Sequence, residues 1–60
     1  MYTVEVIYDN KVDGRPQWEY KRYEYETFVD GFHKKEEIAK DETRYIRGLR
    51  MVGPDGKIYL

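Results

Sequence analysis

Hydrophobic and polar residues alternate along the first segment of the chain. Between positions 2 and 8, one parity holds Tyr2, Val4, Val6 and Tyr8, and the other holds Thr3, Glu5 and Ile7. A period of two with β-branched residues is typical of a half-buried strand. We therefore predict a strand here, with its more apolar side turned toward the core.

A second strand is predicted where the aromatic residues gather. Aromatic side chains favour a pleated, partly buried surface. Their parity changes between Tyr20 and Tyr23, so either both sides of the strand carry aromatic rings or a bulge shifts the register. The stretch is Gln17–Phe28, and half of the aromatic residues of the chain lie in it: Trp18, Tyr20, Tyr23, Tyr25 and Phe28.

The segment between these two strands, Asp9–Pro16, predicts a hairpin connection. Asp13 and Gly14 tolerate positive φ, which a tight hairpin turn requires. Pro16 cannot donate a hydrogen bond to a strand ladder, so it belongs to the connection.

A short helix is predicted after the second strand. Asp30 is the expected N-cap, and Gly31 and Phe32 are expected to open the helix. Phe32, Ile38 and Ala39 can point to one side of it. Because a helix of about ten residues is marginal alone, it must dock on the sheet.

The segment from Asp41 to Val52 allows two interpretations. A continuation of the helix is one, because two sets of residues recur at a spacing of seven: Phe32, Ala39 and Ile46, and Ile38, Tyr45 and Val52. Gly48 and several β-branched or aromatic residues oppose it, since they are poor helix formers. The strand interpretation is favoured. It puts Tyr45, Leu49 and Met51 on one side and Ile46, Gly48 and Val52 on the other.

A turn at Gly53–Gly56 and a short strand over Lys57–Leu60 complete the prediction, because Pro54 and Gly56 suit a type I turn with a bulge. We expect one small α+β domain over residues 1–60. It has a four-stranded antiparallel sheet with one short helix packed on one face, in the order β-β-α-β-β. The expected core is Val4, Val6, Tyr20, Phe28, Phe32, Ile38, Ala39, Leu49, Met51 and Ile58.

The composition of the chain limits how the fold can be stabilised and in which cellular compartment we expect it. A chain of 60 residues buries only about 60% of the surface that it exposes when unfolded. There is no Cys, so disulfides and thiolate metal sites are excluded. The start, MYTVEVIYDN, has no basic region, and no run approaches the ~20 apolar residues of a membrane span. We expect a cytoplasmic protein with no membrane partner.

Candidate catalytic and metal groups are few. With neither Ser nor Cys, the common nucleophiles are missing. His33 is the only histidine and lies among lysines, which is typical of a solvated residue. The sequence from Asp9 resembles a calcium loop faintly, but Lys11 stands where an oxygen ligand is needed. Glu24 and Glu26 lie on one side of the second strand, and their neighbours, Arg22 and basic residues of the adjacent strand, predict ordinary ion pairing in place of acid–base catalysis. We predict no enzyme, no metal and no cofactor.

The remaining candidate is a binding surface. Residues 43–52 contain three arginines and no acid. These arginines either pair with neighbouring carboxylates or join the tyrosines in a basic, aromatic sheet face. Tyr and Arg are enriched at the energetic centres of protein interfaces. The predicted binding residues are Tyr23, Tyr25, Arg44, Arg47 and Arg50.

The function expected from these residues is a small non-enzymatic protein-binding module, an inhibitor or adaptor of the kind that phages and mobile elements encode. It would dock through an aromatic sheet face or an edge strand. A nucleic-acid-binding module is the alternative, weakened by a net charge of −1 and by acids beside each Tyr. A further alternative is a homodimer that buries Ile7, Tyr23 and Tyr25 between two sheets.

Overall fold

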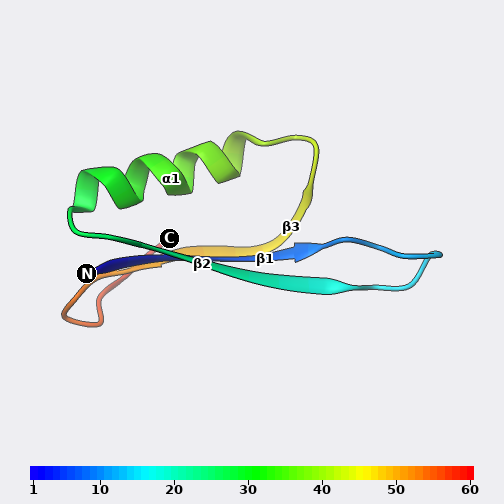
Figure 1. Ribbon diagram of the computed structural model, residues 1–60, viewed down its shortest axis with the longest axis horizontal. Helices are drawn as coiled ribbons and strands as arrows, with labels where there is room; N and C mark the ends of the chain where they lie inside the picture. The colour runs from blue at the N-terminus through cyan, green and yellow to red at the C-terminus, as the bar shows by residue number, and fades with distance from the viewer.

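The computed structural model describes residues 1–60 as one antiparallel sheet with a helix lying along one of its faces (Figure 1). The sheet order is β2-β1-β3-β4, so the first strand is central. The elements are β1 (Tyr2–Asp9), β2 (Trp18–Tyr25), α1 (Phe28–Lys40), β3 (Tyr45–Val52) and β4 (Ile58–Tyr59). The predicted α+β class and the order β-β-α-β-β are confirmed.

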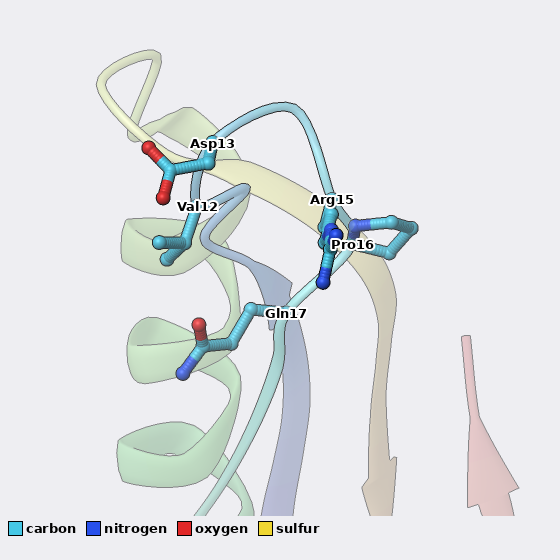
Figure 2. A pocket seen from close by; sticks show the side chains of 5 residues that line it. All are labelled: Val12, Asp13, Arg15, Pro16 and Gln17. Carbon is cyan, nitrogen blue, oxygen red and sulfur yellow. The ribbon is translucent and has the colours of Figure 1, made fainter.

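The hairpin of β1 and β2 is regular from its turn to its base. Asp13 and Gly14 both have positive φ, and Val12 and Arg15 exchange backbone hydrogen bonds of 3.0 and 2.9 Å around them. The side chains around this turn splay outward (Figure 2), and the turn projects beyond the part of the sheet that α1 covers (Figure 1). The register runs without a shift from Asp9 opposite Trp18 to the base of the hairpin. Both sides of β2 therefore carry aromatic rings, and there is no bulge in this strand.

The helix begins three residues earlier than the sequence prediction placed it. Thr27 is the N-cap, and its side-chain oxygen accepts a hydrogen bond of 3.3 Å from the backbone N–H of Asp30. Asp30 lies in the first turn, where its negative charge favours the helix dipole. The prediction of Asp30 as N-cap is wrong, because the Thr27 side chain already accepts a hydrogen bond from a backbone N–H of the first helical turn. Phe28 is thus helical and not part of β2.

The strand interpretation of residues 41–52 is confirmed, with one irregularity. Ile7 lies opposite Gly48 but Tyr8 lies opposite Ile46, so Arg47 is an extra residue on β3. Such a bulge reverses the parity of the residues beyond it. As a result Ile46 shares a side with Leu49 and Met51, and the predicted parity of Tyr45 and Ile46 is wrong.

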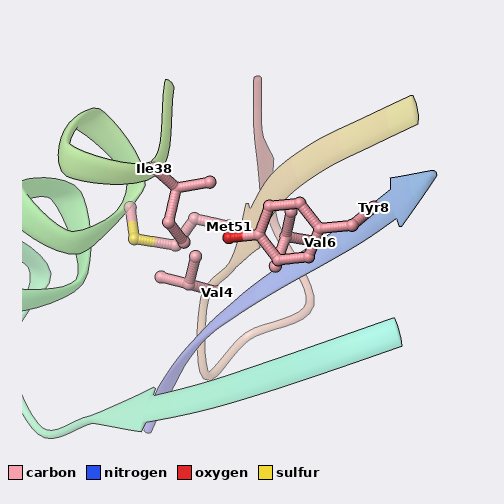
Figure 3. Packing of buried hydrophobic residues seen from close by; sticks show 5 residues of the cluster. All are labelled: Val4, Val6, Tyr8, Ile38 and Met51. Carbon is pink, nitrogen blue, oxygen red and sulfur yellow. The ribbon is translucent and has the colours of Figure 1, made fainter. Parts of the chain in front are cut away.

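The core lies between α1 and the sheet (Figure 3). Its buried side chains are Val4, Val6, Tyr8, Ile38 and Met51. Four of the predicted core residues are therefore correct, and Leu49 packs against the cluster while partly buried. Five predicted core residues are exposed instead: Tyr20, Phe28, Phe32, Ala39 and Ile58.

Phe28 and Phe32 form a smaller aromatic cluster at the start of α1. Their rings stack at 5.7 Å between centroids. Phe28 also meets Tyr2 and Tyr59 edge to face, at 5.8 and 5.1 Å. Aromatic pairs of this kind contribute beyond the surface they bury. The cluster ties the helix to the base of β1 and to β4.

Gly31 sets how closely the helix approaches the sheet. A methyl group at this position would come within 2.8 Å of Met51 Sδ and 3.5 Å of Tyr2 Cβ. Real side chains do not approach so closely, so only glycine allows this spacing without movement of the neighbours. The side chain of Met51, which is completely buried, fills the gap that Gly31 leaves.

We expect Met51→Ala to lower the free energy of unfolding by about 2–5 kcal/mol, because it opens a cavity at the centre of the core. Val29→Ala is the control, since Val29 is 57% exposed on the helix, and it should change stability by no more than about 0.5 kcal/mol. Urea denaturation of the two variants measures the difference. Equal midpoints for both would mean that Met51 is not at the centre of the core.

Candidate functional site

The two faces of the sheet are unequal, because α1 covers only one of them. We call the face under α1 the covered face and the other the open face. Paired residues of neighbouring strands point to the same face, so the registers with Val4 and Ile7 assign each paired strand residue to one of them. The open face carries Thr3, Glu5, Ile7, Asp9, Trp18, Tyr20, Arg22, Glu24, Gly48, Arg50, Val52 and Ile58, together with Tyr45 beyond the bulge.

Three of the five predicted binding residues lie on the covered face. Tyr23 is opposite Val4, and Tyr25 is opposite Tyr2. The Nζ atom of Lys34, on α1, lies 4.6 Å from the centre of the Tyr23 ring. Arg44 stacks over the Tyr8 ring at 3.6 Å. These side chains pack between the sheet and the helix or at its margin, so they are not part of a free sheet surface.

The other two predicted residues, Arg47 and Arg50, lie on the open face. The guanidinium of Arg47 is 5.2 Å from the centre of the Trp18 ring, which belongs to β2 on the far side of β1. The structure therefore separates Tyr23 and Tyr25 from these arginines. It also separates them from Ile7, so the predicted dimer interface that joined Ile7 to both tyrosines is wrong.

The open face instead gathers apolar residues that the sequence analysis did not select. Ile7 lies opposite Tyr20, and Asp9 lies between Trp18 and Tyr45 across the three strands. Trp18 and Tyr45 are both 61% exposed and Tyr20 is 50% exposed. We call Ile7, Trp18, Tyr20 and Tyr45 the aromatic patch.

A signal for this patch was present in the sequence. Every pair in the hairpin is centred on the turn at Asp13–Gly14, from Val12 opposite Arg15 to Val4 opposite Tyr23. Counting outward from that turn assigns Tyr23 to the side of Val4 and Tyr20 to the side of Ile7. The position of the turn thus determines which aromatic residues of β2 share a face with Ile7.

A polar network borders the aromatic patch and holds one of its rings. The Tyr20 hydroxyl donates a hydrogen bond of 2.6 Å to Glu5 Oε2, and Arg50 Nε donates one of 2.8 Å to Glu5 Oε1. The bond from Tyr20, ahead of that from Arg50, holds the pKa of Glu5 below its usual 4.5. The same bond raises the pKa of Tyr20 above its usual 10.0. The network crosses β2, β1 and β3 and fixes the Tyr20 ring.

Most of the arginines near the open face form ion pairs with carboxylates. Arg22 and Glu24 lie 2.7 Å apart, and Arg50 is bound to Glu5. At the margin of the covered face, Arg44 binds Glu19, and this bond lowers the pKa of the Glu19 carboxyl. Arg47 has no carboxylate within ion-pair distance, and its guanidinium lies beside the Trp18 ring. It is the one arginine of the open face whose charge is not matched.

Next to the aromatic patch lies a hollow of about 310 Å³. A Cβ atom added to Gly48 would meet nothing within 4 Å, and the φ angle of Gly48 is not positive. Neither the backbone nor a close contact within the chain requires glycine at this position. The hollow is lined by Glu5, Ile7, Tyr20, Gly48, Leu49, Arg50 and Leu60.

A second hollow lies at the hairpin turn, where the five side chains of Figure 2 surround about 550 Å³. All of them come from one exposed loop, and only Val12 is hydrophobic among them. The hollow offers little apolar surface to a ligand.

No group of three His, Cys, Asp or Glu side chains in the chain could hold a metal ion. The single helix is too short and too polar to cross a membrane.

The chain matches no known protein family, no curated protein and no solved structure.

We expect Gly48→Ala to raise the free energy of unfolding by about 0.5–1 kcal/mol. Glycine in a strand loses more backbone entropy on folding than alanine, and the added methyl group meets open space. Gly31→Ala is the comparison, since its methyl group would meet Met51 Sδ and should destabilise the fold. Thermal denaturation of both variants tests the contrast. A destabilised Gly48→Ala would show that folding itself requires this glycine.

The network at Glu5 should make stability depend on pH below pH 4.5. The pKa of Glu5 is lower in the folded chain than its ordinary 4.5. Its contribution is therefore complete above that value and is lost as the pH falls through the folded pKa. Tyr20→Phe removes the main cause, so we expect a higher Glu5 pKa by NMR titration and a stability deficit at pH 7 that shrinks in acid. Tyr45→Phe is the control and should leave the Glu5 titration unchanged.

Proposed function

We propose that this chain is a small non-enzymatic module that binds another protein through its open face. The observation that carries the proposal is the aromatic patch, where Trp18, Tyr20 and Tyr45 stand at least half exposed on a face that no element covers. Clusters of this kind on a monomer mark interaction surfaces. An inhibitor or an adaptor works in this way, by occupying a surface of its partner.

The chemistry of the patch suits a protein more than another ligand. Tyr, Trp and Arg supply most of the binding energy at protein interfaces, and they do so where a rigid support holds them. Here Tyr20 is fixed by its hydrogen bond to Glu5, and the guanidinium of Arg47 lies 5.2 Å from the centre of the Trp18 ring. Tyr20 therefore has little side-chain freedom to lose on binding, which favours affinity.

Nucleic acid is the second candidate, because aromatic rings beside arginines can stack on bases. The charges weigh against it. Arg22 and Arg50 are both engaged by carboxylates on the open face, so a phosphate would have to displace Glu24 or Glu5. Binding to phosphates needs free basic groups. Beside the aromatic patch these are Arg47 and Lys11, whose Nζ atom lies 5.6 Å from the centre of the Tyr45 ring, and neither has a carboxylate within ion-pair distance.

A cytoplasmic location is part of the proposal. The chain has no Cys and so needs no oxidising compartment to complete its fold.

Trp18→Glu should abolish capture of the partner, because it replaces an exposed ring of the patch with a charge. Tagged chain is incubated with extract of the cells that encode it, and a photo-crosslinker at position 20 identifies what is bound. Val29→Glu is the matched control, because Val29 is similarly exposed on the opposite side of the molecule. We expect one protein that crosslinks to the wild type and to Val29→Glu but not to Trp18→Glu.

Two measurements address the competing functions. Light scattering at high concentration reveals a homodimer, which would itself be the crosslinked species. Titration of labelled single- and double-stranded DNA and RNA at two salt concentrations reveals phosphate contacts, because their release of counterions makes affinity fall steeply with salt. Tight, salt-dependent binding that Arg47→Glu removes would replace the protein partner with nucleic acid.

A further inference from the structure

One edge of the sheet is left without a partner strand. β4 pairs with β3 only at Met51 and Val52, so residues 45–50 have no strand on their outer side. The bulge at Arg47 divides this stretch, and residues 48–50 are the part that continues the regular ladder. The backbone N–H and C=O groups on the outer side of such an edge can pair with an added strand. An extended segment of another chain can use them, as it does when a peptide extends a sheet.

The other edge of the sheet, along β2, is less suited to pairing with an added strand. Glu19 and Lys21 alternate on one side of that strand, and Arg22 and Glu24 on the other. Charged side chains along an edge discourage pairing with another strand. β3 carries apolar residues or glycine at most of its unpaired positions, namely Tyr45, Ile46, Gly48 and Leu49.

Gly48 lies in the unpaired part of β3 and opens a path from the edge to the aromatic patch. A residue of an added strand opposite Gly48 would point to the open face. It would stand two strand spacings, roughly 10 Å, from Ile7. Because Gly48 has no side chain, a large apolar side chain can lean across it into the hollow and contact Ile7 and Tyr20, which line it.

Charge selects the kind of strand. Residues 43–52 contain three arginines and no acid, and Arg47 has no carboxylate partner. Two copies of β3 placed edge to edge would bring no carboxylate to Arg47, because residues 43–52 of each copy contain no acid. An acidic side chain on the added strand would instead pair with the exposed Arg47 once its guanidinium, which lies over the Trp18 ring toward β2, turns to the outer edge of β3.

From these three features we infer that the unpaired edge of β3 binds an extended, acidic segment of the partner protein, with one large apolar side chain of that segment inserted over Gly48. The inference rests on the proposed function and specifies how the partner is held. Backbone pairing with β3 supplies the orientation, and the hollow and Arg47 supply the specificity.

The test uses a displayed library of random dodecapeptides, selected on the full chain, followed by synthesis of the enriched peptides. We expect them to contain a large apolar residue and at least one Asp or Glu near it. Gly48→Val fills the hollow without meeting other atoms at its Cβ, so it should fold normally, as circular dichroism can verify. It should weaken peptide binding at least tenfold in fluorescence anisotropy, and Arg47→Glu should also weaken it. Thr3→Val, at the other end of the open face, is the matched control and should bind normally.

Two further measurements test the backbone pairing itself. In the complex, amides on the outer edge of β3 should gain protection from hydrogen exchange, while those of β2 should not. N-methylation of alternate peptide residues should abolish binding, since it removes donors without altering side chains. The inference is overturned if no peptide is enriched, if Gly48→Val binds as well as the wild type, or if protection appears along β2.

These outcomes separate the inference from the function on which it rests. If crosslinking from position 20 succeeds and depends on Trp18, but Gly48→Val still captures the same protein, the chain is a protein-binding module that does not use the β3 edge. If neither variant affects capture, the open face is not the binding surface and both proposals fail.

Discussion

The contact between Gly31 and Met51 is the constraint on which the rest of the structure depends. A single helix must close the core of a chain that has no disulfide to assist it. It can do so only by lying close to the sheet, because five buried side chains make up the whole core. Gly31 permits that approach, and Met51, whose unbranched side chain adapts to irregular spaces, fills what remains. Because the helix packs on one side of the sheet, the other side stays open to solvent. Folding does not require the residues of that open side to be apolar.

Much of the fold follows from local sequence patterns, and the predictions are wrong where two local signals compete. The alternation from Tyr2 to Tyr8 and the turn at Asp13–Gly14 each allow one interpretation, and both appear in the structure. At the start of the helix, Thr27 and Asp30 are both good N-cap residues. Thr27 prevails because its side chain reaches the N–H of Asp30, and Asp30 then favours the helix dipole. The bulge at Arg47 has no comparable signal, because it arises from the pairing of β3 with β1 and not from β3 itself.

The candidate site was harder to predict than the fold for a related reason. Aromatic residues on β2 look equivalent in sequence, yet Tyr23 and Tyr25 serve the covered face while Trp18 and Tyr20 serve the open one. The difference depends on which side of β1 the helix covers. The helix covers the side that carries Val4 and Val6, which are completely buried. Arginine pairing was anticipated as one alternative, and Arg44 and Arg50 do bind Glu19 and Glu5. The unmatched charge of Arg47 could not be foreseen, because it follows from the bulge.

The exposed rings also bear on stability. Trp18 is 61% and Tyr20 is 50% exposed. A large ring has roughly 150–250 Å² of surface, so covering the exposed parts of both would remove about 200 Å² from water. At ~25 cal/mol per Å², this corresponds to about 5 kcal/mol. A single core in a domain this small rarely supplies more than about 3–5 kcal/mol. Covering the aromatic patch therefore offers a hydrophobic contribution comparable to the free energy of folding, from which the costs of association are subtracted. A partner that binds only the folded state stabilises that state, so binding and stability are linked.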